Sequence, residues 1–287
     1  MADVIDAVFD AIADAAPEVR AGLPDHRATR DDQNASGDTQ LEADVWADDL
    51  LFDRTESIEG VNWYASEERD AVVTVGDAEG GYAVALDPLD GSSNVKSNNP
   101  CGTVVGIYDQ PLPAPGSSLV AAGFVLYGPT TTMVVARDDT VRESLVSETG
   151  ATTDLGPVEL PADPTVYGFG GRVPDWTPAF ESFVRDVEDD LKLRYGGAMI
   201  ADVNQVLVYG GVFGYPGMES APDGKLRAQF EALPIAYIVE TAGGASSDGT
   251  QSLLDVAPTR LHERTPTFVG TDDVIAALDA ALPDHTN

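Results

Sequence analysis

The order of apolar segments along this 287-residue chain restricts its fold more than any other feature. In the first half, short segments rich in Val, Ala and Ile are predicted to be strands, at 71–75, 81–86, 103–108, 119–126 and 132–136. Later segments alternate, with predicted strands at 165–169, 212–215 and 225–230 and predicted helices at 178–187, 198–208 and 234–243. This alternation predicts an α/β (α+β layered) protein in which helices and sheets are stacked.

The N-terminal part is predicted to contain two helices separated by a polar loop. Residues 1–16 have the spacing of an amphipathic helix, and 41–52 have an apolar helical stripe that also carries Asp44 and Asp48 one turn apart. The polar stretch 17–39 between them is predicted to be a loop long enough to act as a lid.

The best candidate for a domain boundary is the segment 147–164, which is rich in Thr, Pro, Asp and Gly. It divides the chain into two halves, 1–160 and 161–287. Both halves mix helix and strand, so we expect two tightly joined parts of one layered protein.

The chain is strongly acidic: 49 acidic and 16 basic residues give a net charge of −33. Such a surface repels nucleic-acid phosphates and anionic membranes, so neither is expected as a partner. The salt-rich cytoplasm of a halophile would screen this self-repulsion. Cys101 is the only cysteine, which excludes an internal disulfide and favours a reducing compartment. Without a signal-peptide pattern or a bilayer-spanning apolar run, a cytoplasmic location is expected.

The strongest local signal is the motif at 87–94, Asp-Pro-Leu-Asp-Gly-Ser-Ser-Asn, which follows a predicted strand. Two carboxylates at a strand end, Asp87 and Asp90, can converge on a hard cation. Gly91 permits a sharp turn, after which backbone N–H groups can form a phosphate cradle. The alternative is an ordinary turn with capping residues.

The other candidate residues have similarly plain alternatives. Glu67 and Glu68 resemble a solvated surface pair, as do Asp38 and Asp44, and they matter only if they cluster around cations. In the segment 225–231, an extended backbone would place two cations and one acid on a single face, which suits phosphate, but an amphipathic surface strand has the same pattern. Tyrosines near 194–199 and 209–215 can contact a sugar or simply fill the core.

In their order, these motifs resemble the class I fructose-1,6-bisphosphatases, within the Mg²⁺-dependent, lithium-sensitive phosphatase superfamily that includes inositol monophosphatase. The motifs that carry the resemblance are Ser66–Glu68, Asp87–Asn94, Arg194–Met199, Ala201–Gly211, Lys225–Glu231 and Ala242–Gly244. The resemblance implies a sugar-phosphatase fold with stacked α-β-α-β-α layers. With the acidic surface, it points to an enzyme of a halophilic archaeon.

The resemblance also implies a set of metal-binding and catalytic residues, most of them in the half 1–160. Two or three Mg²⁺ ions, for which Mn²⁺ can substitute, would be held by Glu67, Asp87, Asp90 and Glu231 and by the carbonyl of Leu89. The catalytic residues would be Glu68 and Asp44, beside the attacking water, and Asp38, which would hold an ion or polarise water.

The substrate-binding residues implied by the resemblance lie in both halves. The 1-phosphate would be held by Asp90, Gly91, Ser92, Ser93 and Arg227. The sugar and the 6-phosphate would be held from the half 161–287 by Tyr195, Gly197, Met199, Tyr215 and Lys225. Arg194 would reach the neighbouring subunit's 6-phosphate, which implies a functional homo-oligomer, a dimer or a tetramer.

The implied function is hydrolysis of the 1-phosphate of fructose 1,6-bisphosphate, a phosphoric monoester hydrolase reaction of gluconeogenesis. Sedoheptulose 1,7-bisphosphate and inositol monophosphate are the alternative substrates, because Gly170-Gly171-Arg172 stands where the family usually has Asn and Tyr. A non-catalytic, phosphosugar-binding regulator is a third reading, but every expected acidic position is filled.

AMP inhibition is expected to be weak or absent. Tyr82 matches the family's AMP site, but Gly81 and Asp109 stand where basic residues are expected. The check is phosphate release in the presence of AMP; strong inhibition by AMP at or below millimolar concentration would contradict this prediction.

Overall fold

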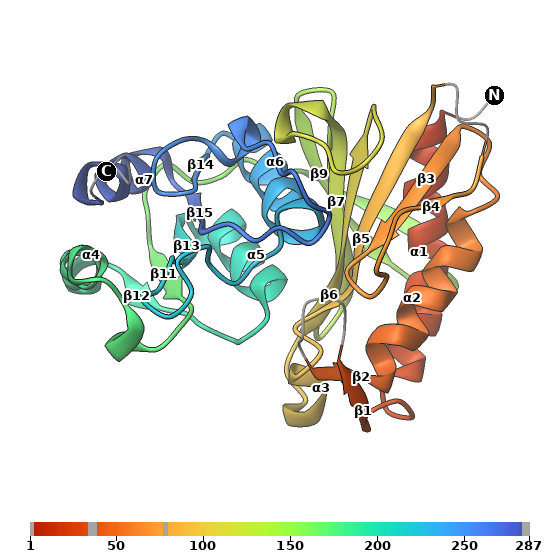
Figure 1. Cartoon of the computed structure of the whole chain (residues 1–287), viewed down its shortest axis with the longest axis horizontal. Helices are drawn as coiled ribbons and strands as arrows, with labels where there is room; N and C mark the ends of the chain where they lie inside the picture. Colours follow the sequence, from red (N-terminus) through yellow and green to blue (C-terminus); the bar gives the residue numbers. More distant parts are fainter. Residues whose placement is uncertain (1–2, 34–38, 77–79, 283–287) are drawn as a thin grey trace.

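A computed structural model describes residues 3–33, 39–76 and 80–282 of the chain (Figure 1). Its helices are α1 (Val4–Gly22), α2 (Glu42–Thr55), α3 (Asn94–Ser97), α4 (Pro178–Asp190), α5 (Met199–Tyr209), α6 (Leu233–Thr241) and α7 (Asp272–Ala281). No helix in the described ranges combines the length and the apolar character that crossing a bilayer requires.

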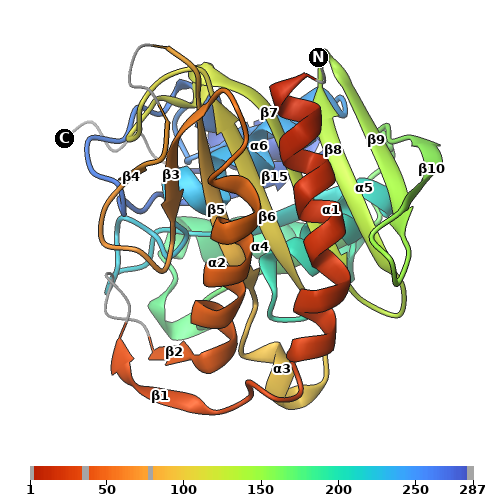
Figure 2. The same ribbon diagram turned by 90° about the vertical axis from the view of Figure 1, so that its right-hand side faces the viewer.

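The larger sheet has eight strands in the order β10-β9-β8-β7-β6-β5-β3-β4. Their bounds are β3 (Val61–Ser66), β4 (Val73–Thr74), β5 (Tyr82–Asp90), β6 (Cys101–Tyr108), β7 (Leu119–Tyr127), β8 (Thr131–Arg137), β9 (Thr140–Val146) and β10 (Thr152–Pro157). Only the pair β3–β5 is parallel. The helices α1 and α2 lie across one face of this sheet (Figure 2).

The smaller sheet has five strands in the order β12-β11-β13-β15-β14. Their bounds are β11 (Val166–Phe169), β12 (Lys192–Leu193), β13 (Gly211–Tyr215), β14 (Ala245–Ser247) and β15 (Thr267–Gly270). The strand β11 is parallel to both of its neighbours, and β15 is antiparallel to both of its own.

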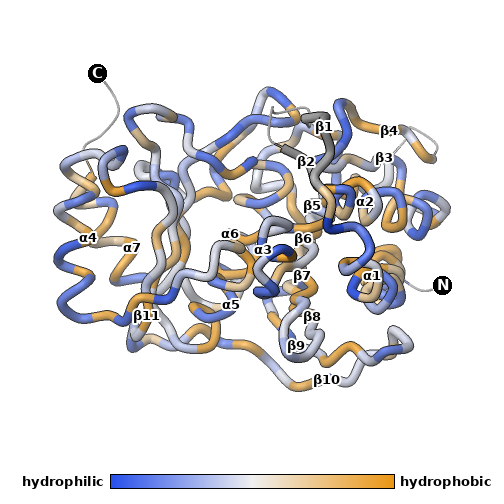
Figure 3. The backbone as a smooth tube through the Cα atoms, turned by 90° about the horizontal axis from the view of Figure 1, so that it is seen from below, coloured by the Kyte–Doolittle hydropathy of each residue, from blue (hydrophilic) through white to orange (hydrophobic). Residues whose placement is uncertain are grey.

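The two sheets and three helix pairs form five layers, with α1 and α2 at one end of the molecule and α4 and α7 at the other (Figure 3). The helices α5 and α6 lie between the sheets. Three clusters of buried apolar side chains correspond to the layer contacts: α1 and α2 with the larger sheet, α5 and α6 between the sheets, and α4 and α7 against the smaller sheet. The predicted α-β-α-β-α stack is confirmed.

Strand alternation explains how the larger sheet serves two cores at once. On β5, Val84 and Leu86 face α1 and α2, whereas Ala83 and Ala85 face α5 and α6. The small alanines allow the central helices to approach the sheet, and the larger Val84 and Leu86 pack in the cluster with α1 and α2. Four of the predicted strands, at β5–β8, are this apolar and were correctly placed.

Strands with polar or short sequences were not predicted. The strand β9 (Thr140–Val146) was not predicted, and β10 (Thr152–Pro157) forms the edge of the sheet although it lies within the Thr-, Pro-, Asp- and Gly-rich segment 147–164. Edge strands carry such residues because one side of them is exposed to solvent. The predicted strand at 71–75 is reduced to two residues, Val73–Thr74.

The expected loop at 17–39 is wrong for most of its described residues. The helix α1 continues through Pro17 to Gly22, because the proline removes only one hydrogen bond and Val19 still packs in the core. Backbone pairing then forms β1 (Thr29–Gln33) and β2 (Thr39–Leu41). Asp38 lies outside the described residues.

The predicted strand at 225–230 is also wrong. After Lys225 and Leu226, Arg227 forms only an isolated bridge, and Ala228–Ala232 is a π-helix, η3, that leads into α6. The wide turn is closed by the Ala232 N–H, which donates to the Arg227 carbonyl (3.0 Å). As a result Arg227 is buried and Lys225 is exposed, so the two cations do not share one strand face.

The π-helix is fixed to the larger sheet by Gln229, which is fully buried. Its side chain accepts from the Ala114 N–H (2.5 Å) and donates to the Ala114 carbonyl (2.9 Å), and the Tyr108 hydroxyl donates to the backbone carbonyl of Gln229 (3.0 Å).

We predict that Gln229→Met lowers the free energy of unfolding by about 2 kcal/mol, because two backbone groups of Ala114 lose their buried partners. Chemical denaturation measures this, with Gln205→Met on α5 as the half-buried control. Equal effects would contradict the prediction.

Candidate active site

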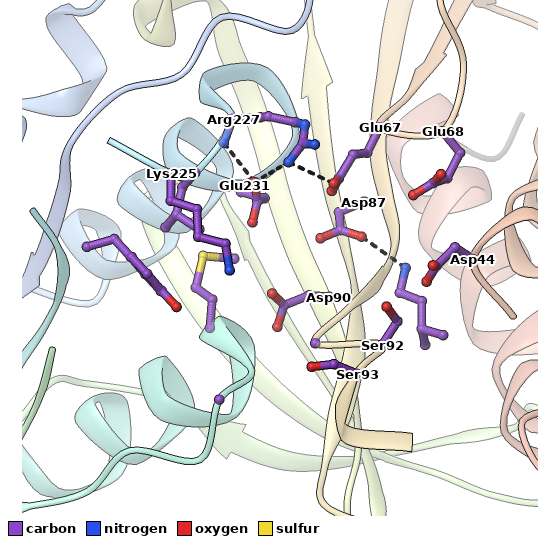
Figure 4. A pocket seen from close by; sticks show the side chains of 16 residues that line it. Asp44, Glu67, Glu68, Asp87, Asp90, Ser92, Ser93, Lys225, Arg227 and Glu231 are labelled. Carbon is purple, nitrogen blue, oxygen red and sulfur yellow. Dashed lines mark hydrogen bonds and ion pairs between the residues drawn. The ribbon is translucent and has the colours of Figure 1, made fainter. Parts of the chain in front are cut away.

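One cavity of about 230 Å³ lies where the end of β5 meets η3 and the start of α5. It is lined by Asp44, Glu67, Glu68, Asp87, Leu89, Asp90, Gly91, Ser92, Ser93, Gly197, Met199, Tyr215, Lys225, Leu226, Arg227 and Glu231 (Figure 4). Six of these residues are acidic and two are basic, so the cavity is strongly negative when they are ionised.

A β-bulge brings the two carboxylates of the 87–94 motif into the same cavity. In a regular strand, residues three apart point to opposite faces. The pairing of β5 with β6 shifts register between Asp87 and Asp90, and this irregularity turns both side chains toward η3. The Leu89 N–H donates to Asp87 Oδ1 (3.0 Å), and the Ile200 N–H at the start of α5 donates to Asp90 Oδ2 (2.8 Å).

Glu67, Asp87 and Glu231 form the centre of the acidic wall. One carboxylate oxygen from each lies within 4.8 Å of the others. The Arg227 side chain is 4% exposed and binds Glu67 Oε1 at 2.8 Å and Glu231 Oε2 at 3.9 Å through Nη1. The Arg227 backbone N–H also donates to Glu231 Oε2 (2.7 Å), so one residue holds carboxylates from two distant parts of the chain together.

The carboxyl groups of this wall are difficult to ionise together. Burial raises the pKa of Asp90 to about 7 and that of Glu231 to about 8, and the Glu67 carboxylate adds repulsion in both cases. Burial and the same neighbour hold the pKa of Asp87 well above its usual range. Hard divalent cations take carboxylate oxygens as ligands and relieve this repulsion. The residues present therefore fit a metal site.

Asp44 and Glu68 lie on the other side of Asp87 from Arg227 (Figure 4). Asp44 is at the start of α2, where the Leu41 N–H donates to its Oδ2 (2.7 Å). Burial raises the pKa of Asp44 to about 6, against the hydrogen bonds from Leu41 and from the Ser92 side chain. The Glu68 N–H donates to Ser66 Oγ (3.1 Å), which fixes the turn after β3.

The turn at Gly91 requires glycine for two reasons. Its φ is +71°, and a Cβ there would lie 2.2 Å from the Cβ of Ala198. The backbone cradle differs from the expectation in one detail: the Ser92 N–H donates to the Leu89 carbonyl (3.1 Å) within the turn. The Ser92 and Ser93 side chains still line the cavity (Figure 4).

The opposite wall carries the residues predicted to contact a sugar. Tyr215, Lys225, Met199 and Gly197 line the cavity, and Lys225 Nζ lies 5.2 Å from the centre of the Tyr215 ring. Tyr195 does not line it directly, but its hydroxyl is 2.6 Å from that of Tyr215.

Two arginines lie away from the cavity. Arg194 is exposed beside the edge strand β12 and donates to the Leu193 carbonyl (3.2 Å). Arg172 is also exposed, and neither arginine is among the described residues of the lining. Gly170 packs against the Tyr215 ring, where a Cβ would lie 2.2 Å from the ring atoms, so the glycine there permits this tyrosine's position.

Two buried residues support the wall that carries Tyr215 and Met199, and neither was predicted as a site residue. Asp202 accepts two hydrogen bonds from the Gly196 N–H (2.7 and 3.0 Å), and Asn94 donates to the Gly196 carbonyl (2.9 Å). Together they fix the loop between Tyr195 and Met199. Asp202 lies within a predicted helix, and nothing in the sequence indicates that its side chain accepts hydrogen bonds from the loop before that helix.

A second supporting group lies behind the acidic wall. Asp48 is 3% exposed and accepts from the Tyr64 hydroxyl (2.9 Å), and it pairs with Arg69 Nε (2.7 Å). Arg69 follows Glu68 directly and stacks on the Phe52 ring at 4.3 Å. The only sign of this role in the sequence was the position of Asp48 one turn after Asp44.

Comparison with known proteins assigns the chain to a family. A model of the fructose-1,6-bisphosphatase N-terminal domain matches residues 5–152, and a model of the C-terminal domain of the same enzyme matches residues 160–283. The chain belongs to the fructose-1,6-bisphosphatase family. The family resemblance read from the motifs is thus confirmed.

Individual family members agree with this assignment over nearly the whole chain. The class 1 fructose-1,6-bisphosphatase of Natronomonas pharaonis is 60% identical, over 99% of this chain and 100% of its own. One from Haloarcula marismortui is 53% identical, over 96% of this chain and 94% of its own. The crystal structure of Leishmania major fructose-1,6-bisphosphatase in holo form has a TM-score of 0.91 at 26% identity, and the match covers 97% of this chain and 94% of that one.

The raised pKa values predict how stability depends on pH without metal. Between about pH 4 and pH 8, the folded protein binds more protons than the unfolded chain at Asp90 and Glu231. Unfolding releases those protons, so the free energy of unfolding should fall as pH rises, by up to about 1.4 kcal/mol per pH unit for each proton. Denaturation in molar KCl with EDTA measures this slope.

Two comparisons separate this effect from the general acidity of the surface. Glu231→Gln should make the slope shallower, whereas Glu59→Gln at an exposed position should leave it unchanged. Added Mg²⁺ should stabilise the protein more at pH 8 than at pH 5, because the ion favours ionised carboxylates. Equal stabilisation at both pH values would contradict the assignment of the cluster as a metal site.

Proposed function

We propose that the chain hydrolyses the 1-phosphate of fructose 1,6-bisphosphate, giving fructose 6-phosphate and phosphate. One observation carries this proposal: a single cavity has a wall of carboxylates on one side and Tyr215 with Lys225 on the other. The first side suits cations and a reacting phosphoryl group, and the second suits a sugar with a further anion. Family membership and relatives named for this activity support the same substrate.

The metal ligands we propose are Glu67, Asp87, Asp90, Glu231 and the Leu89 carbonyl, for two or three Mg²⁺ ions that Mn²⁺ can replace. When bound, such ions neutralise phosphoryl oxygens and lower the pKa of water. The carboxylates of the acidic wall come from the turn after β3, from β5 and from η3, and these elements pack in two of the core clusters. A rigid ligand set of this kind favours catalysis, because it needs no reorganisation during the reaction.

The base is proposed to be Glu68, with Asp44 beside it. Both line the cavity, and the pKa of Asp44, at about 6, suits a group that exchanges a proton near neutral pH. They would take the proton of the attacking water as it approaches phosphorus. Asp38, outside the described residues, is proposed to hold an ion or polarise water when its loop closes.

The phosphate that reacts is proposed to bind the turn at Gly91, Ser92 and Ser93, with Arg227 on the opposite side. The Arg227 guanidinium already pairs with Glu67 and Glu231, so it can orient these acids and contribute an N–H group to a phosphate oxygen. This arrangement keeps positive charge next to a site that would otherwise repel a phosphate dianion.

The sugar and the 6-phosphate are proposed to contact the 161–287 half through Tyr195, Tyr215, Lys225, Met199 and Gly197. Arg194 is exposed on the edge of the smaller sheet, a position from which it can serve a neighbouring subunit. We therefore propose a homo-oligomer, dimer or tetramer, in which this residue completes the partner's 6-phosphate site.

The cellular setting is proposed to be gluconeogenesis in the cytoplasm of a halophile. The net charge of −33 suits a salt-rich interior, and both close relatives named above come from halophilic archaea. Sedoheptulose 1,7-bisphosphate is the second candidate substrate, because Lys225 and Tyr215 would suit any sugar with a second phosphate.

The substrate is tested by phosphate release in molar KCl with Mg²⁺. We expect kcat/KM to be highest for fructose 1,6-bisphosphate, followed by sedoheptulose 1,7-bisphosphate, with inositol 1-phosphate far lower because it lacks the second anion. No preference for a bisphosphate would contradict the role of the Lys225 wall.

The proposed base is tested with Glu68→Gln, which keeps the size of the side chain and removes its basicity. We expect kcat to fall by about 10²–10⁴-fold, with KM within a few-fold of the wild-type value. The exposed Glu59→Gln is the matched control and should keep full activity. Turnover near the wild-type rate in the Glu68 variant would remove this residue as the base.

A further inference from the structure

A second cavity, of about 440 Å³, lies between the C-terminal end of α1, the short helix α3 and the end of β7. Figure 2 shows α3 beneath the lower end of α1. The cavity shares no lining residue with the active site, although Ser93 lines one cavity and Val95 the other. Nothing in the proposed hydrolysis uses this space.

Two arginines, Arg20 and Arg27, line the second cavity, and among the described residues their hydrogen-bond acceptors are neutral groups. Arg20 donates to Thr131 Oγ1 (2.6 Å) and to the Gly128 carbonyl (2.9 Å), and Arg27 donates to the Lys96 carbonyl (2.8 Å). Such bonds fix each guanidinium without neutralising it. Each guanidinium has five N–H donors, so further donors remain for a ligand.

Most arginines in the described part of the chain instead pair with acids. Ion pairs with carboxylates are formed by Arg54, Arg69, Arg137, Arg142, Arg185, Arg227 and Arg260. With 49 acids and 16 bases, an arginine has many carboxylates to pair with. Yet no acidic residue is among the described residues that line the second cavity. Two guanidinium groups therefore share a cavity whose described lining contains no carboxylate.

The remaining lining indicates the kind of anion. Asn98 and Asn99 add amide groups, and Leu23, Val95 and Pro129 provide apolar walls. Phosphate oxygens suit several N–H donors from arginine and asparagine, and apolar walls suit a short carbon body. A nucleic-acid backbone is excluded as a ligand by the overall negative charge of the molecule.

We propose that this cavity is a second anion site, which binds a small organic phosphate between Arg20 and Arg27 independently of the active site. Its ligand would contact α3 and the residues after it, and α3 follows directly on the Ser92–Ser93 turn. Asn94 joins the two regions, because its side chain donates to the Pro100 carbonyl (2.8 Å) beside this cavity and to the Gly196 carbonyl (2.9 Å) beside the other. Occupancy of the second site is thus placed to influence the phosphate turn of the first.

The test is equilibrium dialysis of the full chain with radiolabelled inorganic phosphate, in molar KCl with EDTA. Without divalent cations the acidic active site repels phosphate, so binding reports the second cavity. We expect about one phosphate per chain, with a dissociation constant around 1 mM, as two charge-assisted contacts allow. Adding Mg²⁺ should raise the stoichiometry toward two.

Matched variants assign the binding to the cavity. Arg27→Gln, at an exposed position with one backbone contact, should weaken phosphate binding in EDTA about tenfold, and the double variant with Arg20→Gln should abolish it. Arg54→Gln, which removes an equal charge from exposed α2, should bind like the wild type. Near-ultraviolet circular dichroism verifies that each variant is folded.

The proposal would be overturned by the absence of phosphate binding in EDTA, by unchanged binding in the folded Arg27 variant, or by an equal loss in the Arg54 variant. Masking of the cavity by a second copy of the chain would appear as phosphate binding that weakens with protein concentration, and it would also overturn the site. Activity on a sugar bisphosphate is not part of this measurement, so its outcome is independent of the proposed function.

Discussion

The interaction on which the rest of the site depends is the contact of Arg227 with Glu67 and Glu231. These two acids belong to different layers, one following a strand of the larger sheet and the other within η3. Burial raises the pKa of Glu231, and the Arg227 guanidinium opposes that rise, so without the arginine this carboxyl group would be still harder to ionise. The arginine keeps the acids close and leaves their remaining oxygens directed at the cavity. The arginine thereby joins the larger sheet and η3 at the wall of the cavity.

The sequence allowed the fold class, the layer order and most cavity residues to be predicted, for reasons that can be traced. The strands β5–β8 are apolar on both faces because helices cover both, so their pattern is strong. The motif at 87–94 combines proline, glycine and two acids in a spacing that an ordinary strand would not tolerate. The family resemblance then linked this motif to acids and basic residues more than 100 positions away, which local patterns cannot do.

What could not be predicted depended on non-local contacts or on irregular backbone. The β-bulge that turns Asp90 toward Asp87 is set by pairing with β6, and the π-helix is set by Gln229 reaching Ala114. Asp202 binds a loop and Asp48 binds an arginine, and in a chain with so many acids the sequence does not distinguish these two from surface carboxylates. The Ser92 N–H, expected to face a phosphate, instead closes its own turn.

The π-helix η3 has a consequence for how the family's site can vary. A π-turn contains one residue more than the α-turn that would otherwise join Arg227 to α6. Because each residue of an α-helix turns the chain by about 100°, deleting a single residue from Ala228–Ala232 would rotate Glu231 away from Asp87 while leaving α6 in its core. The extra residue thus sets the direction in which the proposed metal ligand Glu231 points, and a change of length within these five positions would alter the site together with the buried contacts of Gln229.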